Sequence, residues 1–403
     1  MKVSKRVAGV EYAIRDIVQA ARGAQRRGVS IDYLNIGDPV QFGFQPPENV
    51  RQALIDAVRG GENYYAPSEG LPELREAIAK KESAKGLSVS ADDVVVTNGV
   101  SEALDMVISS IVEEGDEVLL PGPYYPPYAS YVRLRGGTPV EFAMDLEESS
   151  VDMEDIRSKI TPRTVAICLI SPNNPSGVVF DKESLAEMVR IAEEHDLYLI
   201  CDEIYDHITF DDNGDGDRRF AGVGAVAGAA PVIILNGFSK VHLMTGWRMG
   251  YVAFNGASPR LDGIRENLPK LARVRITTNL PFQHAALESL RGPQDYIGRF
   301  VSEVRRRRDY IIPRLNEIPG ISCAMPRGAF YAFPKVEDCA KRFGGDKNFV
   351  MSLLERKGVL TVHGSGFGER YGSGHFRIVY LPDIPVLESA MSKLEDFMIN
   401  SSS

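Results

Sequence analysis

Residues 232–240 read Val-Ile-Ile-Leu-Asn-Gly-Phe-Ser-Lys, and residues 246–251 read Gly-Trp-Arg-Met-Gly-Tyr. The apolar run Val232 to Leu235 is typical of a short buried strand. Lys240 follows that strand, where its amine is placed to form a Schiff base, and the guanidinium of Arg248, expected on the next strand, suits a phosphate. The ends of strands are where open α/β sheets bind ligands. The stretch therefore predicts an α/β fold with a ligand site at its strand ends.

Two further polar motifs follow apolar strand patterns. Residues 171–177 read Ser-Pro-Asn-Asn-Pro-Ser-Gly, and residues 201–205 read Cys-Asp-Glu-Ile-Tyr. A carboxylate such as Asp202 would keep a pyridine nitrogen protonated, so that the ring can accept electrons from a substrate. Asn174 and Tyr205 would donate to the phenolic oxygen of the same ring. Together with Lys240, which can act as a base once displaced, these motifs predict a pyridoxal phosphate site.

Strand and helix patterns alternate from about residue 50 to 290, which predicts a large domain with a mostly parallel sheet sandwiched by helices. After Pro293, a long charged helix pattern and short strand patterns predict a small α+β domain. Strands are expected at 94–96, 117–120, 166–170, 198–201, 232–235 and 250–254, and in the small domain around 329–333 and 376–380, with its long helix at 296–315.

The motifs 174–177, 202–205 and 239–248 resemble those of the class I and II aminotransferases, the fold-type-I group of pyridoxal phosphate enzymes. The resemblance extends from residues 34–39 to residues 375–378. The stretches 35–44 and 362–368 are similar to the alanine aminotransferases of archaea and bacteria. The resemblance implies amino-group transfer between alanine and 2-oxoglutarate. Aspartate, aromatic or broad specificity stays open, as do decarboxylation, racemisation and β-elimination.

The resemblance also implies a role for each residue of the cofactor site. Lys240 forms the Schiff base, Asp202 pairs with the ring nitrogen, and Asn174 with Tyr205 contact the ring hydroxyl. Many relatives carry a second serine where this chain has Gly237. The phosphate is expected at a helix start, where free amides attract anions. Its implied contacts are Gly99, Val100, Ser101, Ser239 and Arg248.

Substrate and subunit contacts follow from the same resemblance. Gly37, Asn174 and Arg377 are expected at the substrate. Arg377 is expected to bind the substrate's α-carboxylate, because a bidentate guanidinium suits a carboxylate. Arg15 is a candidate for the distal carboxylate of glutamate, with a solvated helix position as the alternative. Tyr125, or else Tyr124, would stack on the cofactor ring. Tyr65 would reach the phosphate of a neighbouring subunit in a homodimer with shared active sites, and core packing is the alternative for these tyrosines.

The resemblance divides the chain into residues 1–48 and 291–403, which form the small domain, and residues 49–290, which form the large cofactor-binding domain. The small domain is expected to close on the substrate. A cofactor-binding regulator would carry an added basic DNA-binding domain, and only about 35 residues precede the first motif.

Composition narrows the classes of partner. The 403 residues are 44% hydrophobic and 25% charged with a net charge of −9, which argues against nucleic acid as a partner. The basic run Arg305 to Arg308 is interpreted as a solvated helix face. Apolar runs are too short to cross a membrane, and no signal peptide is recognised, so a cytoplasmic protein is expected. Four unpaired cysteines fit a reducing compartment, and the six histidines show no metal-ligand spacing, so no metal is expected.

Overall fold

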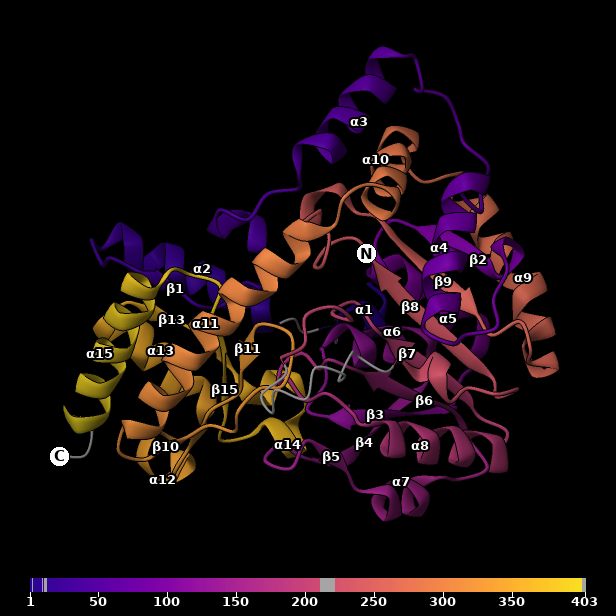
Figure 1. Ribbon diagram of the computed structural model, residues 1–403. Coiled ribbons are helices and arrows are strands. Elements are labelled where there is room, and N and C mark those ends of the chain that lie inside the picture. The colour runs from indigo at the N-terminus through magenta and orange to yellow at the C-terminus, as the bar shows by residue number, and fades with distance from the viewer. Residues whose placement is uncertain (2, 9, 11–12, 211–221, 401–403) are drawn as a thin grey trace.

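The computed structural model describes residues 1, 3–8, 10, 13–210 and 222–400. Figure 1 shows a large part on the right, built around a wide sheet, and a smaller part on the left that contains α2 (Ala13–Arg26), α13 (Asp346–Lys357) and α15 (Ile384–Asn400). Segments from both ends of the chain therefore meet in the smaller part.

The large part is organised around an eight-stranded sheet with the order β2-β9-β8-β7-β6-β3-β4-β5. Strands β4, β3, β6, β7 and β8 are parallel, whereas β9 is antiparallel to both of its neighbours and β5 is antiparallel to β4. This arrangement confirms the mostly parallel sheet, and β4 and β5 are additional to the expected strands. The strands are β2 (Val94–Thr97), β3 (Glu117–Gly122), β4 (Thr138–Asp145), β5 (Ser150–Val151), β6 (Thr164–Ile170), β7 (Tyr198–Asp202), β8 (Val232–Gly237) and β9 (Gly250–Phe254).

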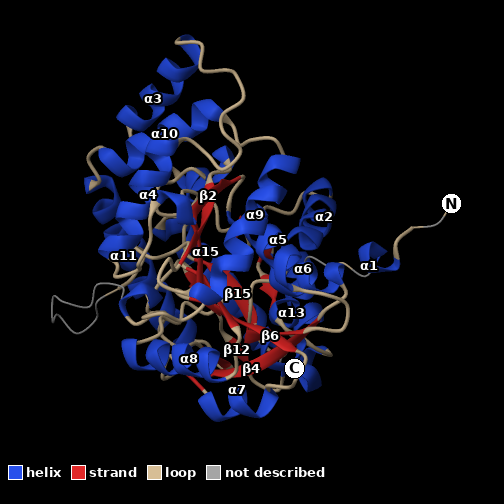
Figure 2. Ribbon diagram, turned by 90° about the vertical axis from the view of Figure 1, so that its right-hand side faces the viewer, coloured by secondary structure: helices blue, strands red, loops and turns tan. Residues whose placement is uncertain are grey.

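Alternate strand residues face two different hydrophobic cores. In β7, Leu199 and Cys201 pack with residues of α4, α8 and α10, whereas Ile200 packs on the opposite face with residues of α5, α6 and α9. This follows from the two-residue period of a strand. Helices cover both faces of the sheet, as Figure 2 shows from the side. These helices are α3 (Glu48–Arg59), α4 (Pro72–Ala84), α5 (Val100–Ile111), α6 (Pro127–Arg135), α7 (Met153–Lys159), α8 (Lys182–Glu194), α9 (Asp262–Val274) and α10 (Leu280–Arg291).

The smaller part contains short sheets that join the two ends of the chain. β1 (Asp32–Tyr33) pairs in parallel with β13 (Val359–Leu360), and β15 (Phe376–Val379) lies between β11 (Tyr331–Ala332) and β14 (Val362–His363). One core contains residues of α2, α11, α13 and α15. The other helices and strands of this part are α11 (Asp295–Glu317), β10 (Ile321–Ser322), β12 (Lys335–Val336), α12 (Cys339–Phe343) and α14 (Glu369–Gly372). The short helix α1 (Lys5–Ala8) instead lies against α6 of the large part. Over the described ranges, no helix has both the length and the apolar character needed to cross a membrane.

The basic run on α11 corrects one expectation from the sequence. Arg307 and Arg308 are buried, so the run is not a solvated face at these two positions. Arg307 donates to the carbonyl oxygen of Leu381, and Arg308 donates to that of Pro326 over 2.9 Å. The guanidinium of Arg308 also lies over the ring of Phe210. These arginines replace water with carbonyl acceptors and aromatic rings, which a charge pattern alone does not reveal.

Candidate active site

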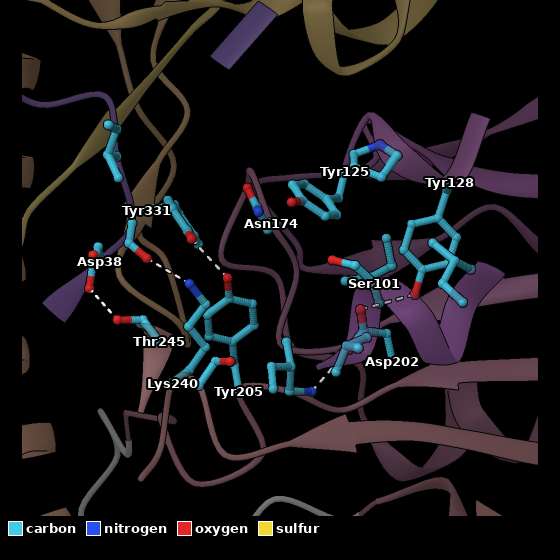
Figure 3. Close-up of a pocket in the computed structure, with 18 of the residues that line it drawn as sticks. Asp38, Ser101, Tyr125, Tyr128, Asn174, Asp202, Tyr205, Lys240, Thr245 and Tyr331 are labelled. Carbon is cyan, nitrogen blue, oxygen red and sulfur yellow. Dashed lines mark hydrogen bonds between the residues drawn. The ribbon is translucent and has the colours of Figure 1, made fainter. Parts of the chain in front are cut away.

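A cavity of about 530 Å³ lies at the carboxyl ends of the parallel strands. Asp202 is the last residue of β7, and Ser239 follows β8 by two residues. Figure 3 shows the side chains that converge there from the sheet, from α5 and from the N-terminal segment. Of the residues expected from the sequence, the cavity is lined by Gly37, Val100, Ser101, Tyr125, Asn174, Asp202, Tyr205, Ser239, Lys240, Arg248 and Arg377.

Lys240 is held at the floor of this cavity by the N-terminal segment. Its Nζ donates a hydrogen bond of 2.6 Å to the carbonyl oxygen of Gly37. Burial, assisted by Arg248 and Arg377, lowers the pKa of Lys240 to about 8, although Asp38 and Asp202 act in the opposite direction. About a tenth of the amine is therefore neutral and nucleophilic at pH 7, and this fraction rises to about half near pH 8.

The backbone at Gly37 approaches the cavity wall closely. A Cβ atom at this position would lie 2.2 Å from the hydroxyl oxygen of Tyr331. Only glycine can therefore bring this carbonyl to the amine of Lys240 without moving the wall.

Asp202 is a buried residue of the cavity wall and accepts two hydrogen bonds. The hydroxyl of Tyr128 donates to Oδ2 over 2.9 Å, and the amide of Ile204 donates to Oδ1 over 3.0 Å. Burial raises the pKa of Asp202 to about 6, and both hydrogen bonds oppose this increase. The carboxylate is therefore mostly ionised at neutral pH and can pair with a cation in the cavity.

A second group of residues is suited to an anion. α5 begins after Gly99, which has a φ of 79°, and the amides of Val100 and Ser101 precede the first hydrogen bonds of the helix. The amide of Gly99 donates to the carbonyl oxygen of Thr97 over 2.9 Å, so, contrary to the expectation, it is not free for an anion. Nη1 of Arg248 donates to Oγ of Ser239 over 3.3 Å and to the carbonyl oxygen of Thr245 over 3.1 Å. A Cβ at Gly99 would lie 2.4 Å from Nη2 of Arg248, so the glycine leaves room for the guanidinium.

Arg248 is placed differently from the expectation. It precedes β9 in a left-handed conformation with a φ of 55°, rather than lying on the strand. The turn directs the guanidinium toward the start of α5, which a residue within the fully buried β9 could not do. The position of Gly237 is too crowded for the second serine, because a Cβ there would lie 2.8 Å from the carbonyl oxygen of Met249.

Arg377 reaches the cavity from β15 of the smaller part. Nη1 donates to Oδ1 of Asn174 over 2.8 Å, and Nη2 donates to the carbonyl oxygen of Asn35 over 2.5 Å. The guanidinium lies 4.7 Å from the ring centroid of Tyr331 and 4.8 Å from that of Phe367. With 1% exposure, Arg377 is a rigid fork suited to a carboxylate.

The tyrosines differ in where the fold places them. Tyr205 and Tyr331 share a hydrogen bond of 2.8 Å between their hydroxyls. Tyr125 lines the cavity, whereas Tyr124 packs in the core beside α5 and α6, and its amide donates to the carbonyl oxygen of Phe367. Tyr65 lies outside the cavity lining and is 76% exposed, so the alternative of core packing is wrong for this residue.

Several cavity residues are additional to those expected. Tyr128 and Tyr331 bond to Asp202 and Tyr205 from positions 74 and 126 residues away, so no local pattern indicates them. Asp38 lies within the expected motif 34–39 and accepts from Oγ1 of Thr245 over 2.6 Å. Arg15 belongs to α2, and its side chain lies outside the described residues.

The set of side chains fits a phosphorylated pyridine. Hydroxyls and a guanidinium beside a helix start suit a phosphate. The buried carboxylate of Asp202 suits a protonated ring nitrogen, and a half-buried amine with a lowered pKa suits attachment to an aldehyde. Arg248 and Arg377 contact different residues, so one anionic group can be bound at each. The cavity can thus hold a cofactor phosphate and a substrate carboxylate together.

Comparisons with known proteins cover almost the whole chain. A family model described as aminotransferase class I and II matches residues 33–394. The glutamate-pyruvate aminotransferase AlaA of Escherichia coli is 38% identical over 407 residues, covering 98% of this chain and 97% of that protein. An alanine aminotransferase structure from Pyrococcus furiosus has a TM-score of 0.95 and 48% identity, covering 99% of this chain and 100% of that one. An aspartate aminotransferase structure from Thermus thermophilus, with maleate, has a TM-score of 0.87 and 33% identity, covering 98% and 99%.

Proposed function

This chain belongs to the class I and II aminotransferases, and from that premise we propose that it transfers an amino group between alanine and 2-oxoglutarate, giving pyruvate and glutamate. Members of this family use pyridoxal phosphate. The observation that carries the proposal is the position of Lys240, whose partly neutral amine shares one cavity with Asp202 and with two separate guanidinium groups.

The cofactor, when bound, supplies an electron-accepting ring that stabilises negative charge on the substrate's α carbon. In our proposal, Ser101, Ser239 and Arg248 hold its phosphate together with the amides of Val100 and Ser101 at the start of α5. Gly99, whose amide is bonded to the carbonyl oxygen of Thr97, leaves room for Arg248. Asp202 pairs with the ring nitrogen, and Tyr128 keeps that carboxylate oriented. Tyr205 and Asn174 donate to the ring hydroxyl, and Tyr125 covers one face of the ring.

Arg377 is proposed to bind the α-carboxylate of the amino acid. Its guanidinium is already fixed by Asn174 and Asn35, so little side-chain entropy is lost when the substrate binds. The carbonyl of Gly37 holds Nζ of Lys240 beside the same space. The neutral Nζ can then accept the proton that leaves the α carbon, and it would return this proton to the cofactor's aldehyde carbon.

One assay tests the proposal. The purified protein, loaded with pyridoxal phosphate, is supplied with 2-oxoglutarate and with alanine, aspartate or an aromatic amino acid in separate reactions, and glutamate formation is measured. We expect alanine to have the highest kcat/KM, with pyruvate formed in equal amount. Release of carbon dioxide or ammonia without glutamate would instead indicate a decarboxylase or a lyase.

We also propose a homodimer with shared active sites, in which the exposed Tyr65 reaches the partner's cofactor phosphate. Tyr64, Val274 and Ile276 are exposed apolar side chains as well, which is common where another chain binds. Residues 1–48 and 291–403 are proposed to form the small domain and residues 49–290 the large one, and the β1–β13 pairing supports this division. Four buried free thiols favour a reducing compartment such as the cytoplasm.

A further inference from the structure

The turn after β7 sends its side chains in two directions. Asp202 and Tyr205 line the catalytic cavity, whereas Glu203 and Asp206 are buried outside its lining. Asp206 lines a second cavity of about 890 Å³, bounded by α4, the end of α10 and the residues after the turn. Contacts that fix Glu203 and Asp206 therefore also fix the backbone that carries the two cavity residues.

Lys85, the residue directly after α4, contacts the buried carboxylates of both Glu203 and Asp206. Its Nζ lies 2.6 Å from Oε2 of Glu203 and 3.2 Å from Oδ2 of Asp206. A third carboxylate, Glu82 on α4, lies 2.8 Å away. Lys81 adds a second ammonium 2.8 Å from Oδ2 of Asp206. Two lysines thus bind the turn to α4 behind the active site.

The same turn is also linked to the strand that leads to Lys240. Nδ2 of Asn236, on β8, donates to Oδ2 of Asp206 over 2.9 Å. The amide of Val223 donates to Oε1 of Glu203 over 2.9 Å. The turn is therefore held from several sides, and its position depends on the two carboxylates staying ionised.

The balance of charge in this cluster depends on the ammonium group of Lys85. Three buried carboxylates face two ammonium groups. Burial acts against the charged form of Lys85, yet Glu203, Glu82 and Asp206 raise its pKa well above its ordinary value. Burial also raises the pKa of Glu203, and Lys85 opposes that increase. Without Lys85, Glu203 would be an uncompensated buried charge that must take up a proton or move.

We propose that Lys85 is a positioning residue for the active site, because its contacts with Glu203 and Asp206 hold the turn that aims Asp202 and Tyr205 into the catalytic cavity. The inference rests on the proposed function, since these two residues are taken to contact the cofactor ring. Lys85 itself touches neither the catalytic cavity nor Lys240.

The test is Lys85→Ala in the full-length holoenzyme. Because small displacements of catalytic groups are costly, kcat should fall about 100-fold with a smaller change in KM. A readout independent of turnover is the pH titration of the visible absorbance of the lysine-bound cofactor. Its midpoint should move to higher pH by about one unit, because hydrogen bonding from Tyr205 is weakened.

The second cavity allows a chemical rescue. Lys85 lines that cavity, so its truncation leaves a space that a small cation can enter from the side away from the active site. We expect millimolar guanidinium, which forms no Schiff base with an aldehyde under these conditions, to restore part of kcat in Lys85→Ala and to have no such effect on the wild type. Lys85→Arg keeps the charge and should retain most of the wild-type kcat.

The matched control is Glu117→Gln, which removes another buried carboxylate. Glu117 is the first residue of β3, at the amino ends of the parallel strands, and it pairs with Arg163. This variant should lose stability without a change in the absorbance titration. If Lys85→Ala melts at lower temperature but keeps kcat and the titration midpoint, the cluster only stabilises the fold and the proposal is overturned.

Should Lys85→Ala not fold, Glu203→Gln decides instead. A shifted absorbance titration in that variant supports the proposal, and an unshifted one with normal kcat overturns it. The titration does not depend on substrate choice. A wild-type enzyme inactive on alanine would therefore refute the proposed function, and the result of the absorbance titration could still be interpreted.

Discussion

The Nζ of Lys240 and the carbonyl oxygen of Gly37 lie 2.6 Å apart, which joins the loop after β8 directly to the N-terminal segment. A second link lies beside it, because Oγ1 of Thr245 donates to Oδ1 of Asp38. Figure 3 shows both bonds on the same side of the cavity. The segment that precedes the large part therefore contacts the amine of Lys240, which we propose as the catalytic base.

Replacing this amine should remove the chemistry but not the cofactor site. We expect Lys240→Ala to abolish turnover and to lose the visible absorbance of lysine-bound cofactor, while pyridoxal phosphate still binds through Ser101, Ser239 and Arg248. Steady-state assays and an absorbance spectrum after gel filtration measure the two effects. Near-normal transamination by this variant would refute the role of Lys240.

The lowered pKa of Lys240 predicts how cofactor attachment depends on pH. Only the neutral amine attacks an aldehyde, and its fraction grows as pH rises through about 8. The rate at which apoenzyme binds pyridoxal phosphate covalently should therefore increase between pH 7 and 9, a range well below the ordinary lysine pKa. Stopped-flow absorbance measures this rate, and a rate that rose only near pH 10 would contradict it.

Asp202→Asn should separate stability from activity. Because a neutral ring nitrogen stabilises the carbanion poorly, kcat should fall about 1,000-fold or more. In the apoenzyme, burial raises the pKa of Asp202 from 3.8 to about 6, so the wild type loses stability as pH rises through this range. The asparagine variant avoids this loss and should be more stable at pH 7 by up to about 3 kcal/mol.

Urea unfolding of both apoenzymes at pH 7 and pH 4 measures the difference in the free energy of unfolding. The advantage of the variant should vanish at the lower pH, where the wild-type carboxyl is protonated. A loss of kcat of only a few-fold would mean that another group serves the ring nitrogen.

Local patterns predict the residues that follow strands but not the partners that packing brings to them. Lys240 and Asp202 lie at strand ends within short motifs, so sequence is sufficient to place them in one site. The partner of Asp202 is Tyr128 on α6, and the hydrogen bond joins residues 74 apart in the chain. The burial of Arg308 likewise depends on the carbonyl of Pro326 and the ring of Phe210, which only the folded chain supplies.

The exposed apolar side chains Tyr64, Tyr65, Val274 and Ile276 predict assembly. Their two segments lie together, because Oγ of Ser68 donates to the carbonyl oxygen of Ile276. Light scattering should give at least twice the mass of one chain, and Val274→Asp should weaken the assembly because it places a charge in an apolar interface. Ile399→Asp, at an exposed apolar residue near the other end of the molecule, is the control. A fully active monomer at assay concentration would overturn the homodimer.

The last prediction concerns substrate choice, because the enzyme must accept both the methyl group of alanine and the second carboxylate of glutamate at one site. Ala13, at the start of α2, packs with Phe367, whose ring lies against the guanidinium of Arg377. This packing places Ala13 close to the proposed carboxylate site, and Arg15, two residues further along the chain, stays our candidate for the distal carboxylate. Arg15→Ala should therefore raise KM for glutamate and 2-oxoglutarate much more than for alanine and pyruvate. Arg22→Ala, at an exposed position on the same helix, should change neither pair. Equal effects of Arg15→Ala on both pairs would reject Arg15, whereas a wild-type preference for aspartate over alanine would reject the alanine assignment and leave the aminotransferase family standing.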